Sequence, residues 1–218
     1  MGTTLPVTVA IPVGPHPANQ RWFSEALESV QAQTFSPSEI LVIDDGANLP
    51  PMAWLNIWKT PWLSGVAHAF NFGVALAQNE WVVMLGSDDR LMPNCLERAW
   101  SVWQTHHDLL GYYAFIVQYD NGLVQYDVPC NAAMVTKTLW RHTGGFPIEA
   151  AVGACDSFLL SLLLAGKGRF GTVYQVGSRS EPVYWYRQHP ETDTALRGEM
   201  YWEMEKVRDI YLRRRLTT

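Results

Sequence analysis

Residues 82–93 read VVMLGSDDRLMP, a run of apolar residues followed closely by two adjacent carboxylates, Asp88 and Asp89. The apolar run is typical of a strand that is buried on both faces, and Pro93 indicates the start of a helix. Burying an unpaired charge is costly, so two acids at the end of such a strand call for a partner.

The first half of the chain alternates strand and helix patterns. Near-continuous apolar runs predict parallel strands, and the 3.6-residue spacing of apolar residues between them predicts helices on both faces of a sheet. We therefore expect an α/β protein with three layers (α/β/α) and a mostly parallel central sheet. The predicted strands are PVTVAIPV (6–13), EILVIDDG (39–46) and NEWVVML (79–85), and the predicted helices cover 21–34 and, from about Val66, 64–78. The intervening NLPPMAWLNIWKTPWL is broken by Pro and predicts a loop with a short helix or an edge strand.

A second pair of acids repeats the design of the first. Asp44 and Asp45 end the strand pattern at 39–46, as Asp88 and Asp89 end the one at 79–85. Ligands of parallel α/β sheets bind beyond the carboxyl ends of the strands, so we expect all four acids to converge on one cleft.

The second half of the chain has a different sequence pattern. Asp120-Asn121-Gly122 between two apolar runs predicts a hairpin, and an apolar helix is expected from about Cys155 to Ala165, where Gly166 stops it. A charged helix is expected over residues 195–215. Because no repeat or linker divides the chain, we expect the second half to pack as an extension of the first within one domain.

Composition excludes several classes of protein. The 218 residues are 48% apolar and 17% charged, which indicates a compact globular domain. A net charge of −5 argues against nucleic acid as a partner. Three widely spaced Cys argue against a disulfide framework or a zinc site. The first residues have neither a signal-peptide pattern nor a transmembrane segment, so we expect a cytoplasmic protein.

Paired acids at a strand end have three interpretations. Asp88 or Asp89 could cap the helix that begins near Pro93, or the two could act as a general acid and base. They could also hold Mg²⁺ or Mn²⁺ together with diphosphate oxygens and water. The pair alone leaves these alternatives open, and the second pair favours the metal.

Four motifs in a fixed order resemble a known family. They are VTVAIPV followed by ALESVQAQTFSPSEILVIDDGA, then SGVAHAFNFGVALAQNEWVVMLGSDDRLMP, HTGGFPIEAAVGACDSFLLSLLLAGKG and VYWYRQHPETDT, spread from residue 7 to about residue 194. In these motifs the chain is similar to the inverting glycosyltransferases of the GT-A fold, specifically family two.

The resemblance implies site residues. Asp45 would bind the nucleobase, Asp156 would be the general base, and Asp89 would bind Mn²⁺ or Mg²⁺ with His189 as a second metal contact. The substrate-binding residues that it implies are Pro12, Asp44, Asp45, Asn71, Asp88, Gly145 and Arg187. Other interpretations stay open, because Asp156 could be a first-turn acid of its helix, His189 a solvated loop residue and Arg187 a residue that only extends from its strand.

The resemblance also implies an organisation and an activity. A single GT-A domain over 1–218 would divide into a nucleotide-sugar-binding half (1–92), an acceptor-side half with a small β extension (93–194) and a C-terminal helix (195–218). The expected reaction moves a sugar, of hexosyl type, from a nucleotide-diphosphate donor to a hydroxyl acceptor in glycan or polysaccharide synthesis. A UDP-sugar is the favoured donor, and a homodimer and a peripheral position at the inner membrane face stay open.

Departures from the family pattern keep two alternatives in view. Ser87 stands where the first acid of the D-x-D motif is usual, Gly14-Pro15 replaces an aromatic residue and Asn, and Phe70 replaces an Arg before Asn71. These departures allow a relative that binds nucleotide-sugars without catalysis. A dinucleotide-dependent oxidoreductase is the lesser alternative, because the turn PVGPHPANQ lacks the G-x-G-x-x-G pattern.

Overall fold

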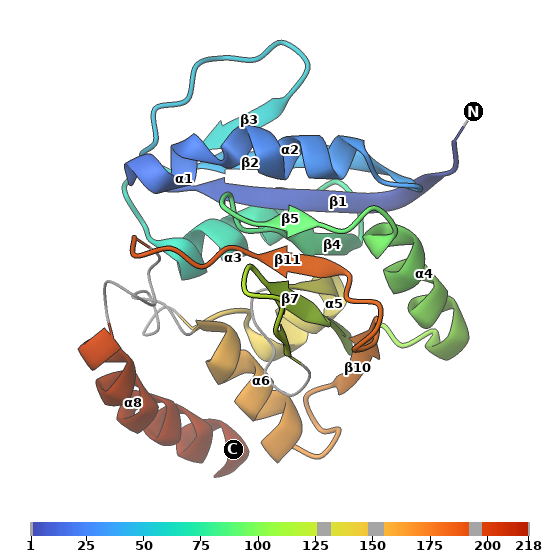
Figure 1. Cartoon of the computed structure of the whole chain (residues 1–218). Helices are drawn as coiled ribbons and strands as arrows, with labels where there is room; N and C mark the ends of the chain where they lie inside the picture. Colours follow the sequence, from blue (N-terminus) through green and yellow to red (C-terminus); the bar gives the residue numbers. More distant parts are fainter. Residues whose placement is uncertain (1, 126–131, 148–154, 192–197, 218) are drawn as a thin grey trace.

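A central sheet forms the middle layer of the protein. The computed structural model describes residues 2–125, 132–147, 155–191 and 198–217. The strands of this sheet are β1 (Thr4–Val13), β2 (Ser36–Asp44), β3 (Asn56–Lys59), β4 (Trp81–Met84), β6 (Gly111–Phe115), β9 (Ala133–Thr136) and β10 (Thr172–Val176). Within the described residues they form a seven-stranded sheet in the order β10-β6-β9-β4-β1-β2-β3. Figure 1 labels β1, β2, β3, β4 and β10 of this sheet.

Most neighbouring strands in this sheet are parallel. β1 pairs in parallel with β2 and β4, β2 with β3, and β6 with β10, whereas β9 runs antiparallel to β4 and β6. The predicted α/β class with a mostly parallel sheet is therefore confirmed, and β3 is the predicted edge strand.

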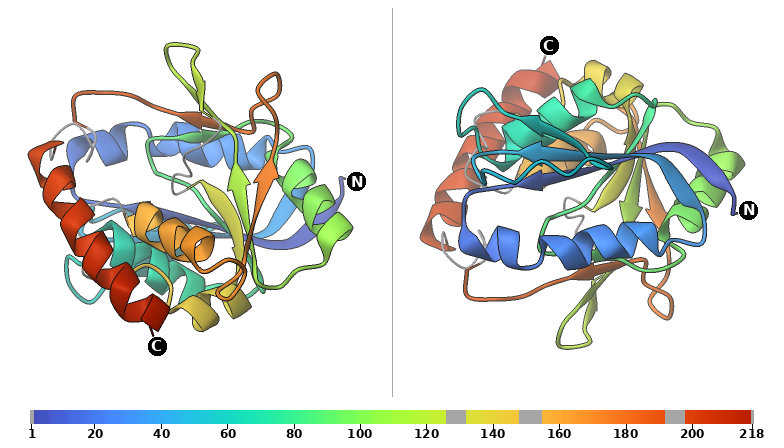
Figure 2. Two further views of the ribbon diagram at one scale, coloured as in Figure 1. Left: turned by 90° about the horizontal axis from the view of Figure 1, so that it is seen from below. Right: turned by 90° about the horizontal axis from the view of Figure 1, so that it is seen from above.

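Helices cover both faces of the sheet, as the strand pattern predicted. One face packs against α2 (Phe23–Gln31) and α4 (Cys95–His106). The other packs against α3 (Val66–Leu76), α5 (Lys137–Thr143) and α6 (Cys155–Ala165), with α8 (Gly198–Thr217) outside them (Figure 2). Successive β1 residues alternate between the two cores, because side chains along a strand point to opposite faces. Val9 and Ile11 lie in the first core and Ala10 lies in the second.

Helix boundaries follow the local signals closely. α3 begins at Val66 and α6 covers Cys155–Ala165, as predicted. The helix predicted over 21–34 is α2, and Trp22 separates it from a preceding short helix, α1 (Pro17–Arg21), that was not predicted. His16 caps α1 by accepting a hydrogen bond from the Ala18 amide at 3.3 Å. Within the described part of the chain, no helix combines the length and apolar character needed to cross a membrane.

The second half of the chain shares the central sheet with the first half. It contributes β6, β9 and β10 to the central sheet itself. The predicted hairpin does form, from β7 (Val117–Tyr119) and β8 (Val124–Gln125), with Gly122 at φ +81° in its turn. These strands belong to a second sheet, ordered β5-β11-β7-β8, with β5 (Arg90–Leu91) and β11 (Tyr184–Tyr186). The start of the helix predicted over 195–215 and residues 192–194 of the last motif lie outside the described residues.

Candidate active site

The turn after β4 carries the two adjacent acids Asp88 and Asp89. Asp89 is buried, and its carboxylate accepts hydrogen bonds from the Tyr184 hydroxyl at 2.7 Å and from the Arg187 amide at 2.9 Å. The same Tyr184 hydroxyl accepts a bond from the Gly86 amide at 3.1 Å. β11 therefore fixes the end of β4, although about one hundred residues separate them in the chain.

Burial dominates the electrostatics of Asp89. Removal from water raises the pKa of this carboxyl group well above its ordinary value, and the neighbouring Asp88 raises it further. The bonds from Arg187 and Tyr184 lower the pKa without cancelling these effects. A poorly solvated pair of acids favours a cation nearby.

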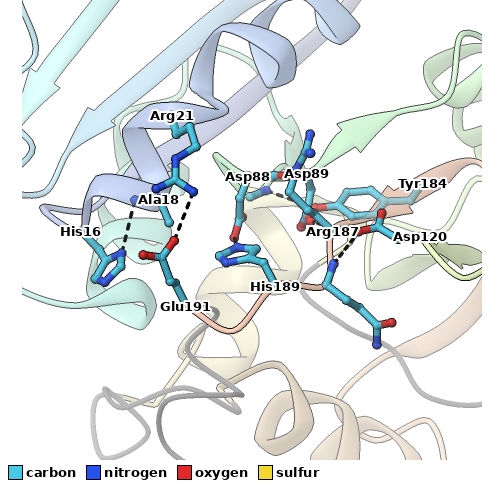
Figure 3. Close-up of polar contacts among 12 residues, drawn as sticks. His16, Ala18, Arg21, Asp88, Asp89, Asp120, Tyr184, Arg187, His189 and Glu191 are labelled. Carbon is cyan, nitrogen blue, oxygen red and sulfur yellow. Dashed lines mark hydrogen bonds and ion pairs between the residues drawn. The ribbon is translucent and has the colours of Figure 1, made fainter.

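Asp88 and His189 form a donor pair beside Asp89. The Oδ2 atom of Asp88 lies 3.2 Å from the Nε2 atom of His189, whose side chain is only 8% exposed (Figure 3). Among the described residues, nothing hydrogen-bonds to Asp88 Oδ1, and His189 Nδ1 is buried without a partner. The Trp22 ring packs on the imidazole, with the centroids 4.5 Å apart. His189 is thus a nearly buried residue and not the solvated loop histidine of the alternative interpretation.

Residues 187–191 run across the site and are tied down along their length. The Arg187 side chain donates to Glu25 Oε2 at 2.6 Å and to the Asp88 carbonyl at 2.8 Å. The Gln188 amide donates to Asp120 Oδ2 at 3.1 Å, and Glu191 pairs with Arg21 at 3.4 Å (Figure 3). No local sequence pattern links α1, α2 and β11, so Tyr184, Glu25 and Trp22 could not be predicted at this site from the sequence.

Asp44 and Asp45 face a different segment. Asp45 accepts four hydrogen bonds at 2.7–2.8 Å, from the Thr60 hydroxyl, the Ser64 amide and hydroxyl, and the Gly65 amide. Asp44 accepts bonds from the amides of residues 48 and 49, each at 3.0 Å. Among the described residues, no hydrogen bond or ion pair joins these acids to Asp88 or Asp89. The four acids lie at the same edge of the sheet, since each pair follows the C-terminal end of a parallel strand, but each pair organises its own loop.

Asn71, Gly145 and Pro12 belong to the framework of this edge. Asn71 Oδ1 accepts bonds from Trp140 Nε1 at 2.9 Å and from the Phe146 amide at 3.0 Å, and its Nδ2 donates to the Phe146 carbonyl at 2.8 Å. Gly145 has φ +70°, and a Cβ there would lie 2.3 Å from Trp140 Nε1, so only glycine fits this turn. Pro12 is buried near the end of β1, opposite Ile43 of β2.

Asp156 lies in the first turn of α6. Burial raises its pKa from 3.8 to about 6, although the amides of Ser157 and of Asp156 itself donate to the carboxylate and oppose the rise. The N-terminal end of α6 lies on the same side of the molecule as the C-terminal ends of β1 and β11 (Figure 1). A carboxyl group with this pKa is ionised at neutral pH and is more basic than an ordinary aspartate.

The donor set at the β4 turn suits a hard divalent cation that shares its coordination with a substrate. Within the described residues, no three His, Cys, Asp or Glu side chains are grouped to hold a metal ion by themselves. Asp88 and His189 nevertheless present one oxygen and one nitrogen donor at 3.2 Å, next to Asp89. Mg²⁺ and Mn²⁺ accept such ligands and complete their coordination with phosphate oxygens and water. Asp88, Asp89 and His189 therefore fit a site for either cation.

Solved structures share the fold. Residues 1–349 of S. aureus TarS in complex with UDP superpose with a TM-score of 0.66 at 16% identity, covering 94% of this chain and 64% of that one. The same region of TarS with UDP-GlcNAc gives a TM-score of 0.65 at 16% identity, covering 87% and 60%. At this identity the likeness establishes the GT-A fold.

Sequence comparison identifies the family. An uncharacterized glycosyltransferase of Nostoc sp. is 33% identical over 108 residues, which cover 42% of this chain and 31% of that protein. One from Haemophilus influenzae is 26% identical over 133 residues, covering 55% and 50%. The chain thus aligns with half or less of the length of these relatives. The family model "Glycosyl transferase family 2" matches residues 19–143, more than half of the chain. The chain belongs to glycosyl transferase family 2.

Proposed function

We propose that the protein moves a sugar, of hexosyl type, from a nucleotide-diphosphate donor to a hydroxyl acceptor, with inversion at the anomeric carbon and with the help of a divalent cation. The observation that carries the proposal is the buried Asp88–Asp89 turn at the end of β4, with His189 brought against Asp88 by the segment after β11. A UDP-sugar is the proposed donor, because TarS, which shares the fold, is described in complex with UDP and UDP-GlcNAc.

The β4 turn would receive the diphosphate. Asp88, Asp89 and His189 would hold Mn²⁺ or Mg²⁺ there, with carboxylate oxygens from the two acids and an imidazole nitrogen from His189. A bound cation would neutralise the charge that develops on the leaving diphosphate. Nearly complete burial of Asp89 and His189 keeps water out of this corner, which strengthens electrostatic interactions with the diphosphate.

The loop anchored by Asp45 would shape the nucleoside side. Both carboxylate oxygens of Asp45 already accept bonds from Thr60, Ser64 and Gly65. We therefore propose that Asp45 acts mainly by holding this loop next to the base. Asp44 acts in the same way on residues 48 and 49.

Asp156 would be the general base. At neutral pH its carboxylate is ionised and can take the proton of the acceptor hydroxyl as that oxygen attacks the anomeric carbon. The bond from the acceptor oxygen to the carbon forms while the bond from that carbon to the diphosphate oxygen breaks. A single displacement of this kind inverts the anomeric centre.

Mass spectrometry tests the proposal. The protein is incubated with UDP-, GDP- and dTDP-sugars, with and without Mn²⁺, and donor hydrolysis or transfer is followed for the wild type, Asp89→Ala and Asp156→Asn. Glu97→Gln is the control, because Glu97 is an acid in the first turn of α4 that accepts a hydrogen bond from Thr34, outside the site. We expect loss of turnover in the first two variants only. Unchanged turnover in both would show that the catalytic assignment is wrong.

A relative that binds the donor without catalysis is the second candidate. It is favoured by Ser87, a buried residue where the family usually has an acid. Thermal-shift measurements with the same sugars separate the two functions, since a donor-dependent shift without turnover would support this candidate.

A further inference from the structure

The positively charged side chain of Arg187 is largely buried and makes its contacts within the protein. Its side chain is 14% exposed, and its guanidinium lies 4.6 Å from the ring centroids of both Trp22 and Trp185. The group donates to Glu25 on α2 and to the carbonyl of Asp88, and the backbone amide of Arg187 donates to Asp89. One residue of the segment after β11 thus contacts α2 and both acids of the β4 turn.

This arrangement needs the geometry of arginine. The planar guanidinium makes two hydrogen bonds in different directions while it packs between indole rings, whereas a lysine ammonium is a point charge without a fixed fork. Glu25 is held from a second side by Arg90, whose Nη1 lies 3.8 Å away and whose guanidinium packs on Trp185 at 3.8 Å. The Glu25 carboxylate is therefore set in place to receive Arg187.

The β4 turn depends on contacts of this kind for its shape. A Cβ at Gly86 would lie 2.7 Å from Asp89 Oδ2, so position 86 has no room for a side chain that could hold the turn in shape. Within the described residues, segment 184–189 anchors the turn through Tyr184, Arg187 and His189. Arg187 extends this anchor to α2 through its hydrogen bond to Glu25.

We propose that Arg187 is a positioning residue that braces the Asp88–Asp89 turn against Glu25 of α2, and that it sets the affinity of the site for the donor and its cation without touching the diphosphate. The inference rests on the proposed function and replaces the direct substrate contact that the resemblance implied for Arg187. It makes Glu25, which lies outside the catalytic set, a determinant of donor affinity.

Kinetics of four variants test the brace. Arg187→Gln, Arg187→Lys, Glu25→Gln and the double variant Arg187→Gln/Glu25→Gln are compared with Arg98→Gln. Arg98 pairs with Glu181 at 2.7 Å and, among the described residues, has no hydrogen bond or ion pair with the turn, so its loss reports the effect of removing an arginine pair elsewhere. For each variant, the donor KM, the acceptor KM and the Mn²⁺ concentration for half-maximal rate are measured.

We expect Arg187→Gln and Glu25→Gln to raise the donor KM and the Mn²⁺ requirement about 10- to 100-fold, because small displacements of positioned groups have effects of that size. The acceptor KM should stay unchanged. The double variant should be no worse than Arg187→Gln alone, and Arg187→Lys should restore little. A direct diphosphate contact predicts the opposite pattern, with recovery in Arg187→Lys and wild-type kinetics in Glu25→Gln, and that pattern would overturn the proposal.

Hydrogen exchange measured by mass spectrometry gives a readout that does not need turnover. The amides of residues 86–89 should exchange faster in Arg187→Gln and Glu25→Gln than in the wild type and Arg98→Gln. Unchanged exchange would refute the brace even if the enzyme is active. If the amides of the two variants exchange faster but the wild-type protein neither binds nor turns over any donor, the brace is supported and the proposed function is refuted.

Discussion

In the proposed mechanism, the raised pKa of Asp156 makes the stability of the fold and catalysis oppose each other at one residue. The difference between the ordinary value of 3.8 and about 6 corresponds to about 3 kcal/mol against the ionised form in the folded state. Solvent screening at this partly exposed side chain reduces the expected effect to roughly 1–2 kcal/mol. Asp156→Asn, which is neutral at every pH, should therefore increase the free energy of unfolding at pH 7 by that amount while it abolishes transfer.

The pH dependence of the free energy of unfolding is a second test of whether ionised Asp156 destabilises the folded protein. A carboxyl group whose folded pKa lies above its unfolded pKa binds more protons when folded, so it destabilises the native state as pH rises through the interval between the two values. The advantage of Asp156→Asn should be full above about pH 6 and should fade towards pH 4. Urea denaturation of both proteins at pH 7, 5.5 and 4.5 measures this change.

The alternative interpretation of Asp156 predicts the opposite result. An acid that only favours the start of its helix stabilises it in the ionised form, so its removal would cost about 0.5–1 kcal/mol at pH 7. Glu97→Gln on α4 serves as the control for an ordinary first-turn acid and should show a small loss of that kind. If Asp156→Asn is less stable than the wild type at pH 7, the reasoning from burial is wrong.

Three other predictions follow from the same geometry. The kcat/KM should fall about tenfold per pH unit below about pH 6, because Asp156 acts as a base only when ionised; a flat profile between pH 5 and 7 would contradict this. Asn71→Ala should lower the free energy of unfolding in urea by about 2–4 kcal/mol, since it leaves Trp140 Nε1 and the Phe146 amide without their acceptor. Chelation by EDTA should remove transfer activity and added Mn²⁺ should restore it, whereas activity that persists after exhaustive chelation would refute the cation requirement.

Local patterns predicted elements whose signals lie within a few residues. The start of α3 and the bounds of α6 were correct, because apolar periodicity indicates both helices and Gly166 stops α6. The hairpin turn at Gly122 was correct for the same reason. The helix α1 was missed, since it has only five residues and its cap, His16, gives a weak local signal.

Long-range pairing was less accessible from the sequence. β9 has four buried residues and no alternation to reveal that it enters the central sheet antiparallel between β4 and β6. Burial on both faces removes the period-two pattern that distinguishes one strand environment from another. The share of the second half in the central sheet was therefore visible only in the tertiary structure.

By itself, the sequence determined the α/β class, the placement of two acid pairs at strand ends and the resemblance to a glycosyltransferase family, because each of these depends on residues that are close along the chain. The tertiary structure alone decided what each acid contacts. Asp45 meets the loop at 60–65, Asp88 meets His189, and Arg187 meets Glu25, 162 residues away. Such contacts depend on how the strands and helices are brought together, and side-chain partners at that distance leave no periodicity or spacing in the sequence.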